Sequence, residues 1–290
     1  MPPGAIRVAR SVPWYPPGTM PPHDGPFAAA GHGSEYDSFA AIYARWTDSA
    51  ASTGPNLPFY VDTYVRADGP VVELGIGDGR IAVEAALRGC DVIGVDASPA
   101  MLALCRQRAE RAGVTARITV IAADFRDFEL PEPAGLIALP YHSIGHLVTL
   151  EAKRQAIRQV FAQLRPGGRF VFDDFLMTSA LMTQMRQVQL RATYRSPAGA
   201  DVLLWVTSLV DAASQSVTVV TWEDELDADG LLERRRYRRL SLSWLEPAQA
   251  RELLVETGFA IEACYGDFQG TPFTEPNPLE QIWMARKPGA

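Results

Sequence analysis

Cysteine and long apolar runs are scarce in this sequence, and basic residues are fewer than acidic ones. Only Cys90, Cys105 and Cys264 are present among 290 residues, an odd and widely spaced set that offers neither a disulfide framework nor a metal-ligand spacing. No apolar run approaches the roughly 18 residues that are needed to span a bilayer. We therefore expect a protein of the reducing cytoplasm, without a membrane partner.

Acidic residues outnumber basic ones, with 34 Asp and Glu against 27 Lys and Arg and a formal net charge of -7. Because a general nucleic-acid binder needs a cationic surface to release counterions from phosphates, this balance argues against a nucleic-acid partner. The arginine-rich run at residues 234–239 fits a strand whose alternate side chains point to solvent, although it would also suit an anionic substrate. The N-terminus lacks the basic and apolar regions of a signal peptide, which again favours the cytoplasm.

Proline and glycine are concentrated in residues 1–33, which therefore cannot sustain the hydrogen bonds of a helix or a ladder and are predicted to form a flexible arm. A helix is expected next, with Ser34 as its N-cap. Its aromatic and apolar side chains recur at helical spacing: Tyr36, Phe39, Ala40 and Tyr43.

Short apolar strands then alternate with helices. The strands are nearly continuous apolar runs, as burial on both faces requires. They are expected at residues 71–74, 92–96, 118–122, 136–139 and 169–175, and the intervening helices at residues 81–87, 99–112 and 151–164. This alternation implies right-handed crossovers and a doubly wound, Rossmann-like α/β fold with a parallel sheet.

Residues 192–244 follow a different pattern. Segments rich in Val, Thr, Leu and Tyr are separated by turns such as Asp229-Gly230, which predicts an antiparallel meander. Trp205 and Trp222 within it either line the binding site of an apolar substrate or pack in the core of the meander. A helix at residues 247–257 and two strands near 259–265 and 281–286 follow. We thus divide the chain into an arm (1–33), a core (34–191 and 245–290) and an antiparallel β insert (192–244) that caps the active site.

The segment Glu73-Leu74-Gly75-Ile76-Gly77-Asp78-Gly79 closes the first strand and opens a helix. Glycine lets the backbone approach a ligand, and the helix N-terminus presents free N–H groups. Asp96 ends the second strand, where an acidic side chain accepts hydrogen bonds from ribose hydroxyls. Asp124 follows the third strand and is placed to reach an adenine amine, with Phe125 beside it. Both carboxylates have a simpler explanation as turn or capping residues.

A nicotinamide dinucleotide is the main rival ligand for this glycine turn. Its fingerprint requires Gly-x-Gly-x-x-Gly or Ala, but Arg80 stands at the third position here. Glu73 would repel a pyrophosphate, whereas it suits a ligand that carries an ammonium and a sulfonium group. The residues therefore favour S-adenosylmethionine (SAM) as the cofactor.

Four segments resemble, in order and spacing, the motif series of the class I SAM-dependent methyltransferases: Glu73–Gly79, Val95–Ser98, Ala123–Phe125 and Leu164–Gly168. The resemblance implies a seven-stranded sheet of order 3-2-1-4-5-7-6 with an antiparallel seventh strand. It also implies that Glu73 and the glycines lie along the methionyl part, with Asp96 on the ribose and Asp124 and Met101 on the adenine. The cofactor-binding residues predicted in this way are Tyr36, Tyr43, Glu73, Gly75, Gly77, Asp96, Ala97, Met101, Asp124, Phe125 and Leu139.

The loop after the fourth strand, residues 139–147, contains two of the chain's four histidines. Ligands of open α/β sheets bind outside the carboxyl ends of the strands, and imidazole is the natural base near neutral pH. The predicted catalytic residues are His146, His142, Tyr141 and Tyr36, and the alternative for each histidine is a ring satisfied by backbone carbonyls. The two histidines have an i, i+4 spacing, but no nearby residue completes a zinc site, so no metal is expected.

Tyr36-Asp37 with Tyr43, and the segment 143–147, resemble parts of the deoxysugar N,N-dimethyltransferases of antibiotic pathways and, more distantly, glycine N-methyltransferases. This resemblance implies that His146 is the base or an orienting group and that Tyr36 contacts cofactor or substrate. We therefore predict methylation of a small-molecule amine in bacterial secondary metabolism. The alternatives are O- or C-methylation, a cyclase or binding protein that does not methylate, a nicotinamide oxidoreductase, and a nucleic-acid methyltransferase. Whether copies of the chain associate is left open.

Overall fold

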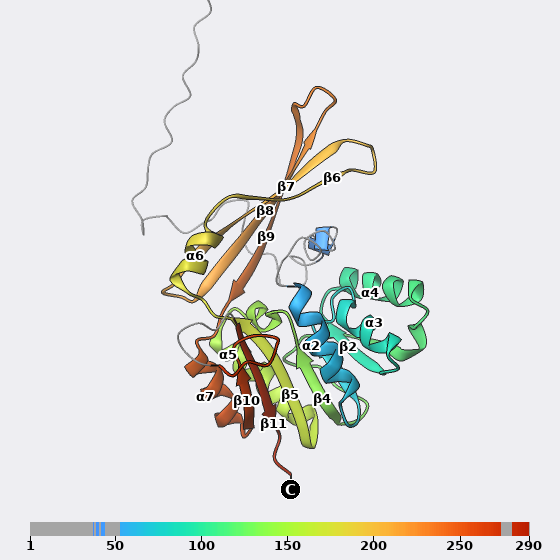
Figure 1. Cartoon of the computed structure of the whole chain (residues 1–290), viewed down its shortest axis with the longest axis vertical. Helices are drawn as coiled ribbons and strands as arrows, with labels where there is room; N and C mark the ends of the chain where they lie inside the picture. The colour runs from blue at the N-terminus through green and yellow to red at the C-terminus, as the bar shows by residue number, and fades with distance from the viewer. Residues whose placement is uncertain (1–36, 38, 41, 44–52, 274–279, 290) are drawn as a thin grey trace, which may run out of the picture. The chain divides into compact units, whose positions relative to one another are not determined.

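Two β-sheets organise the part of the chain that the computed structural model describes, which is residues 37, 39, 40, 42, 43, 53–273 and 280–289 (Figure 1). The predicted arm at residues 1–33 and the candidate residue Tyr36 lie outside the described residues. The helices are α2 (Thr53–Val65), α3 (Arg80–Leu87), α4 (Pro99–Arg111), η1 (Thr115–Arg117), η2 (Ser143–His146), α5 (Leu150–Gln163), α6 (Ser179–Met185) and α7 (Pro247–Thr257).

The larger sheet has seven strands in the order β3-β2-β1-β4-β5-β11-β10. Neighbouring strands from β3 to β5 are parallel, and β11 is antiparallel to both β5 and β10. Counted along this sheet, the order is 3-2-1-4-5-7-6, so the predicted fold is confirmed. Its strands are β1 (Val71–Leu74), β2 (Val92–Asp96), β3 (Ile118–Ala122), β4 (Ala134–Leu139), β5 (Leu164–Phe175), β10 (Ala260–Tyr265) and β11 (Glu280–Arg286).

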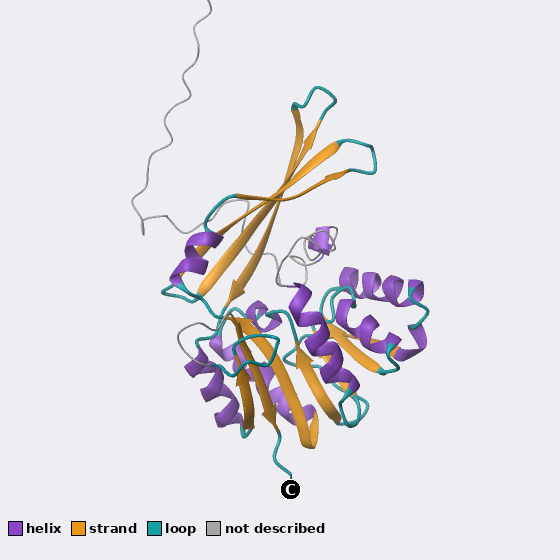
Figure 2. Ribbon diagram, in the orientation of Figure 1, coloured by secondary structure: helices purple, strands orange, loops and turns teal. Residues whose placement is uncertain are grey.

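Helices cover both faces of this sheet, because its central strands are apolar on both sides (Figure 2). Val72 and Leu74 of β1 belong to a core cluster that includes residues of α5 and α7. Val71, whose side chain points to the other face, belongs to a cluster with α2, α3 and α4. Alternate side chains of one short strand thus join two cores, and the carboxyl ends of the parallel strands meet at a single edge.

Helix α2 is a feature that the sequence analysis missed. Its sequence contains Pro58 within the helix, and proline removes a backbone donor, so the segment has no clear helical signal. Tertiary packing compensates, since Tyr60, Val61 and Tyr64 are all at most 1% exposed. The helix matters for the site because it brings Tyr60 under the carboxyl end of β5, as the contacts below show.

The smaller sheet is an antiparallel meander of four strands, β6 (Gln189–Arg195), β7 (Asp201–Asp211), β8 (Ser216–Leu226) and β9 (Leu232–Ser243). Three of these strands were predicted, which confirms the meander, whereas β6 and the preceding α6 were not. One face packs Leu204 against Phe39 and Ile42 of the helical residues before the core. Among the described residues, no helix is both long and apolar enough to cross a membrane.

Candidate active site

The turn between β1 and α3 is shaped by glycines with a left-handed backbone. Gly75 and Gly77 have φ angles of 67° and 57°, a region that residues with a Cβ rarely adopt. The Gly75 amide donates to the carbonyl oxygen of Val95 at 2.7 Å, which ties the turn to the end of β2. A Cβ on Gly75 would lie 3.1 Å from Ser143 Oγ and 3.2 Å from the Phe125 ring. The space beside the turn is therefore open only because residue 75 has no side chain.

Asp96 anchors this turn through its carboxylate. Its Oδ2 accepts the Gly77 amide at 2.9 Å, and its Oδ1 accepts the Ser98 amide at 2.8 Å. Burial raises the pKa of Asp96, and these two backbone donors oppose the rise. Each carboxylate oxygen keeps a second lone pair, so the side chain can also accept a hydrogen bond from a ligand hydroxyl. This geometry is compatible with the ribose contact predicted for Asp96.

Ser98 connects α4 to the helical residues before the core. Its Oγ accepts the Met101 amide at 3.2 Å as the N-cap of α4 and donates to Asp37 at 2.6 Å. Because Asp37 precedes Tyr43 in the same helical segment, this bond holds Tyr43 beside the end of β2. Tyr43 and Met101 both line the pocket described next.

A pocket with about 790 Å³ of empty space, part of it open to solvent, lies at the carboxyl ends of the parallel strands. We name its two sides the cofactor wall, formed by the glycine turn and the residues after β2 and β3, and the acceptor wall, formed by the loop after β4 and by β9. The lining residues are Tyr43, Gly75, Gly77, Asp96, Ala97, Ser98, Met101, Asp124, Phe125, Tyr141, Ser143, His146, Leu147, Leu240 and Ser241.

Asp124 on the cofactor wall is oriented by a neighbouring arginine. Arg126 Nε and Nη2 reach the two carboxylate oxygens at 2.8 and 2.7 Å, and the Arg126 amide donates to Oδ1 at 2.9 Å. The side chains of Asp124 and Arg126 are 31% and 40% exposed, so solvent weakens the pair. Asp124 thus lines the pocket with a carboxylate that Arg126 orients only weakly.

Glu73 lies next to the glycine turn but does not line the pocket, and only 2% of it is exposed. Burial raises the pKa of Glu73 to about 8, although the Tyr64 hydroxyl and the Arg80 guanidinium oppose the rise. Its Oε2 has no hydrogen-bond partner among the described residues. Because a buried carboxyl oxygen without a partner is costly, burial favours the protonated form of Glu73. Glu73 thus lies behind the glycine turn, and its role beside the methionyl part of SAM stays a prediction.

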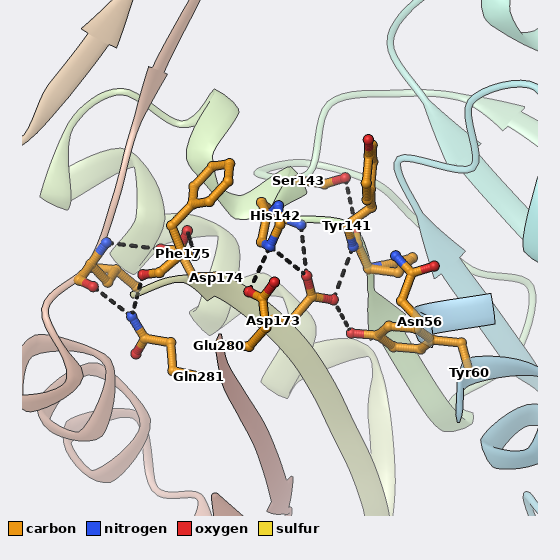
Figure 3. Close-up of polar contacts among 12 residues, drawn as sticks. Asn56, Tyr60, Tyr141, His142, Ser143, Asp173, Asp174, Phe175, Glu280 and Gln281 are labelled. Carbon is orange, nitrogen blue, oxygen red and sulfur yellow. Dashed lines mark hydrogen bonds and ion pairs between the residues drawn. The ribbon is translucent and has the colours of Figure 1, made fainter. Parts of the chain in front are cut away.

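The loop after β4 begins with two consecutive residues in left-handed backbone, Tyr141 at φ 59° and His142 at φ 55°. Such a backbone costs a residue with a Cβ about 1–2 kcal/mol. Asp173 at the end of β5 compensates, because its two oxygens accept the amides of Tyr141 and His142, each at 2.9 Å. The Tyr60 hydroxyl of α2 also donates to Asp173 (Figure 3). The loop is thus held by a carboxylate on another strand.

The His142 side chain points away from the pocket, toward Asp173 and Glu280 (Figure 3). Its Nε2 lies 2.8 Å from Glu280 Oε2 and 3.5 Å from Asp173 Oδ2, and its ring stacks on Phe175 with 3.8 Å between centroids. Burial alone lowers the pKa of His142, but the carboxylates of Glu280 and Asp173 outweigh it and raise the pKa to about 9. The ring is therefore a buried cation at neutral pH.

Lys153 of α5 holds the other end of the same loop. Its Nζ donates to the carbonyl oxygens of Ile144 and Leu147 at 2.8 and 2.7 Å and to Ser243 Oγ at 2.8 Å. Burial lowers the pKa of Lys153 to about 8, and the charge of Asp174 opposes this effect. A buried cation thus binds the carbonyl end of η2 and ties it to the base of β9.

The structure brings most of the predicted site residues to one pocket. Of the predicted cofactor-binding residues, Glu73 and Leu139 are buried and do not line it, and Tyr36 is outside the described residues. Of the predicted catalytic residues, Tyr141 and His146 line the pocket and His142 does not. The predicted residues that line it are Tyr43, Gly75, Gly77, Asp96, Ala97, Met101, Asp124, Phe125, Tyr141 and His146.

Sequence reasoning missed the residues that hold the acceptor wall in place. Asp173 and Asp174 follow the apolar run Phe170–Phe172 near the carboxyl end of β5, and both are 0% exposed. A pair of acids after a buried apolar run is a usable signal for a site. Tyr60, Lys153 and Glu280 carried no comparable signal. Their roles come from contacts between segments that are far apart in the chain.

Comparison with known families agrees with this geometry. Residues 71–168 match the family model described as a methyltransferase domain. The carboxy-S-adenosyl-L-methionine synthase of Vibrio parahaemolyticus is 27% identical over 131 residues, which cover 42% of this chain and 52% of that protein. The chain therefore spans about half the length of the curated relatives that it matches.

Two solved structures extend the likeness to most of the chain. The CcbJ methyltransferase from Streptomyces caelestis is 19% identical with a TM-score of 0.74, and the match covers 90% of this chain and 100% of that one. The sugar N-methyltransferase KedS8 from a Streptoalloteichus species is 18% identical with a TM-score of 0.64, covering 98% and 100%. At these identities the likeness shows the fold. Together with the domain match, it agrees with the cofactor predicted from the glycine turn, SAM.

Proposed function

We propose that this class I SAM-dependent methyltransferase, identified by its domain match and its fold, transfers a methyl group to an amino group of a small molecule. One observation carries the proposal: the pocket lined by Gly75, Gly77 and Asp96 is also lined by Tyr141 and His146. A cofactor on the glycine turn and an acceptor beside the histidine would share one space, and proximity of this kind is the main requirement for methyl transfer.

We propose that SAM binds along the cofactor wall. The glycine turn would lie along the methionyl part, with the Asp96 carboxylate on the ribose hydroxyls and Asp124 with Met101 on the adenine. SAM supplies a methyl group on a sulfonium sulfur, which is already electrophilic. The remaining tasks of this chain are to orient an acceptor and to remove its proton.

The acceptor wall offers a base and mostly neutral surroundings. Among the described lining residues, the carboxylates are Asp96 and Asp124, both on the cofactor wall. We propose that an acceptor amine enters the other side in its neutral form. As its nitrogen bonds to the methyl carbon and the carbon–sulfur bond breaks, the amine becomes acidic and passes a proton to His146. Tyr141 and Ser241 are placed on the same side, where their hydroxyls would orient the acceptor.

The architecture of a named neighbour supports the choice of an amine. KedS8 is a sugar N-methyltransferase, and its fold matches this chain through the meander as well as the core. We propose that the meander, whose Leu240 and Ser241 reach the pocket, caps the acceptor in this chain. A small polar amine such as an amino sugar would fit beneath it.

The proposal is tested by incubating the full chain with methyl-labelled SAM and matched acceptors. Glucosamine, glycine and tyramine provide amines, and glucose, glycolate and tyrosol provide the corresponding hydroxyls. We expect label in an amine product and none in its hydroxyl partner. Label only in hydroxyl or carbon products would overturn N-methylation, and SAM binding without any transfer would favour a binding protein. Stabilisation by NAD but not by SAM in a thermal melt would overturn the cofactor itself.

A further inference from the structure

Buried side chains of opposite charge bind the two ends of the loop between β4 and α5. At its start, the amides of Tyr141 and His142 point at Asp173. At its end, the carbonyl oxygens of Ile144 and Leu147 point at Lys153. Successive amides in left-handed backbone form a concave anion-binding nest, and helix carbonyl ends attract cations. Each charge therefore matches the backbone dipoles that it contacts.

At the start of this loop, three carboxyl groups lie close together. Asp173 is fully buried beside Glu280, and Asp174 follows it in β5. Burial raises the pKa of Asp173, and the charge of Glu280 raises it further, whereas His142 lowers it. The Tyr60 hydroxyl supplies one more donor but no positive charge. Among the described residues, His142 is the cationic side chain that contacts both Asp173 and Glu280.

We infer that His142 is a positioning residue: its imidazolium, paired with Glu280 and beside Asp173, holds the loop that presents Tyr141 and His146 to the pocket. This inference rests on the proposed function, in which His146 receives the proton. Figure 3 shows the ring directed at the two carboxylates, and the Tyr141 ring stacks beside it with 5.7 Å between centroids. His142 takes no proton from the acceptor, because its ring is committed to Glu280 and stacked on Phe175.

Two substitutions of His142 test whether its side chain must reach Glu280 to hold the loop. Asn tolerates left-handed backbone, but its amide ends where the histidine Nδ1 lies and does not reach Glu280. Gln places an amide nitrogen near the position of Nε2 and restores a donor to Glu280. Because Gln restores the donor but not the positive charge, we expect the Asn variant to lose the loop geometry and the Gln variant to keep part of it.

The first measurement is steady-state kinetics with whichever probe amine the wild-type chain methylates. We expect His142→Asn to lower kcat about 10- to 100-fold, the range for a misplaced catalytic group, while KM for SAM changes by less than about 2-fold. His142→Gln restores the hydrogen bond but not the charge, so its kcat should lie between those of wild type and His142→Asn, about 3- to 10-fold below wild type. A Gln variant as inactive as His146→Ala, with normal SAM binding, would mean that His142 reacts with the acceptor. An Asn variant with wild-type kcat would mean that the pair does not position the loop.

The second measurement does not depend on turnover. Histidine NMR of the full chain should show one imidazole that titrates near pH 9, and this signal should be absent in both His142 variants. In Glu280→Gln the same signal should titrate closer to the ordinary range, because the strongest attractive charge is gone. If instead no imidazole titrates above neutral pH, the ion pair does not exist and the inference is overturned.

Amide hydrogen exchange at residues 141 and 142 gives a third measurement. Both amides should exchange slowly in the wild type and in His142→Gln, and about 10-fold faster in His142→Asn as the nest opens. If the wild type transfers label to none of the probe acceptors, the proposed function fails, but the NMR and exchange results still decide whether His142 positions the loop. Equal exchange in all three proteins would contradict positioning.

Discussion

The two walls of the pocket are built by different means. On the cofactor wall, Asp96 accepts amides from Gly77 and Ser98, which are 19 and 2 residues away. On the acceptor wall, Glu280 contacts His142 across 138 residues, and Tyr60 contacts Asp173 across 113. The first wall uses backbone groups of adjacent strands, whereas the second uses buried charged side chains from distant elements. One wall is a local motif, and the other is a product of the whole fold.

This difference predicts different sensitivities. The cofactor wall depends on free space beside glycine, so added volume should damage it. The acceptor wall depends on ionisation, since His142 is a buried cation and Lys153 donates to carbonyl oxygens. Removal of one charge in such a cluster leaves the others unbalanced, so the acceptor wall should respond to changes of charge and pH.

The largest effect is expected at the histidine that faces the pocket. His146→Ala should lower kcat about 10²- to 10⁴-fold, or about 3–5 kcal/mol in the activation barrier, because a proton acceptor is lost. The affinity for S-adenosylhomocysteine, measured by calorimetry, should change by less than about 2-fold. A large loss of this affinity would mean that the two walls are not separate. His142→Gln is the matched control, with a histidine four residues earlier replaced on the same loop.

A smaller effect is expected where the walls meet, at Gly75. Gly75→Ala places a methyl group 3.1 Å from Ser143 Oγ and 3.2 Å from the Phe125 ring, so SAM affinity should fall about 10- to 100-fold, or about 1.4–2.7 kcal/mol. Gly89→Ala is the control for backbone strain, because Gly89 has φ 90° but open space around a Cβ. Both variants should lose about 1–2 kcal/mol of stability, and only the first should lose affinity. Equal affinities would show that the space beside the turn holds no ligand.

The pH dependence of the free energy of unfolding should report the charge of His142 in the acceptor wall. The pKa of His142 rises from its usual 6.5 to about 9 on folding, so its contribution is fully present below pH 6.5 and is lost as the pH rises through 9. Between about pH 7 and 9 the free energy of unfolding should fall by about 1–2 kcal/mol more in wild type than in His142→Gln. Urea unfolding at both pH values measures this difference. Glu73, whose pKa burial raises to about 8, adds a decline of the same sign to both proteins, and equal declines would contradict the His142 contribution.

The contrast between the walls also explains what the sequence could predict. Residues 73–79, Asp96 and Asp124 each follow a recognisable strand, and the order of strands in this fold brings them to one edge. The positions of Gly75, Gly77 and Asp96 in the pocket follow from that order. The roles of these residues toward SAM remain predictions, as do the boundaries of the insert.

The acceptor wall was harder to predict because its shape depends on side chains in other segments. A histidine at residue 142 and one at residue 146 look equivalent in the sequence. In the structure, the left-handed backbone of His142 turns its ring toward Glu280, whereas His146 lines the pocket. Helix α2 was missed because Pro58 hides its helical pattern, and Tyr60 was lost with it. Local patterns do not encode such contacts, which form only when distant elements pack together.

The smallest effect is expected for the exposed arginine on the cofactor wall. Arg126 orients Asp124 at 2.7 and 2.8 Å, but its side chain is 40% exposed, and exposed pairs contribute about 0.2–1 kcal/mol. Arg126→Ala should therefore change SAM affinity by less than about 5-fold, and the change should shrink at high salt. Arg117→Ala, which removes an exposed pair with Asp91 away from the pocket, should leave the affinity unaltered. A loss greater than tenfold in Arg126→Ala alone would mean that the cofactor wall, like the acceptor wall, depends on a charged side chain, and the comparison between them would fail.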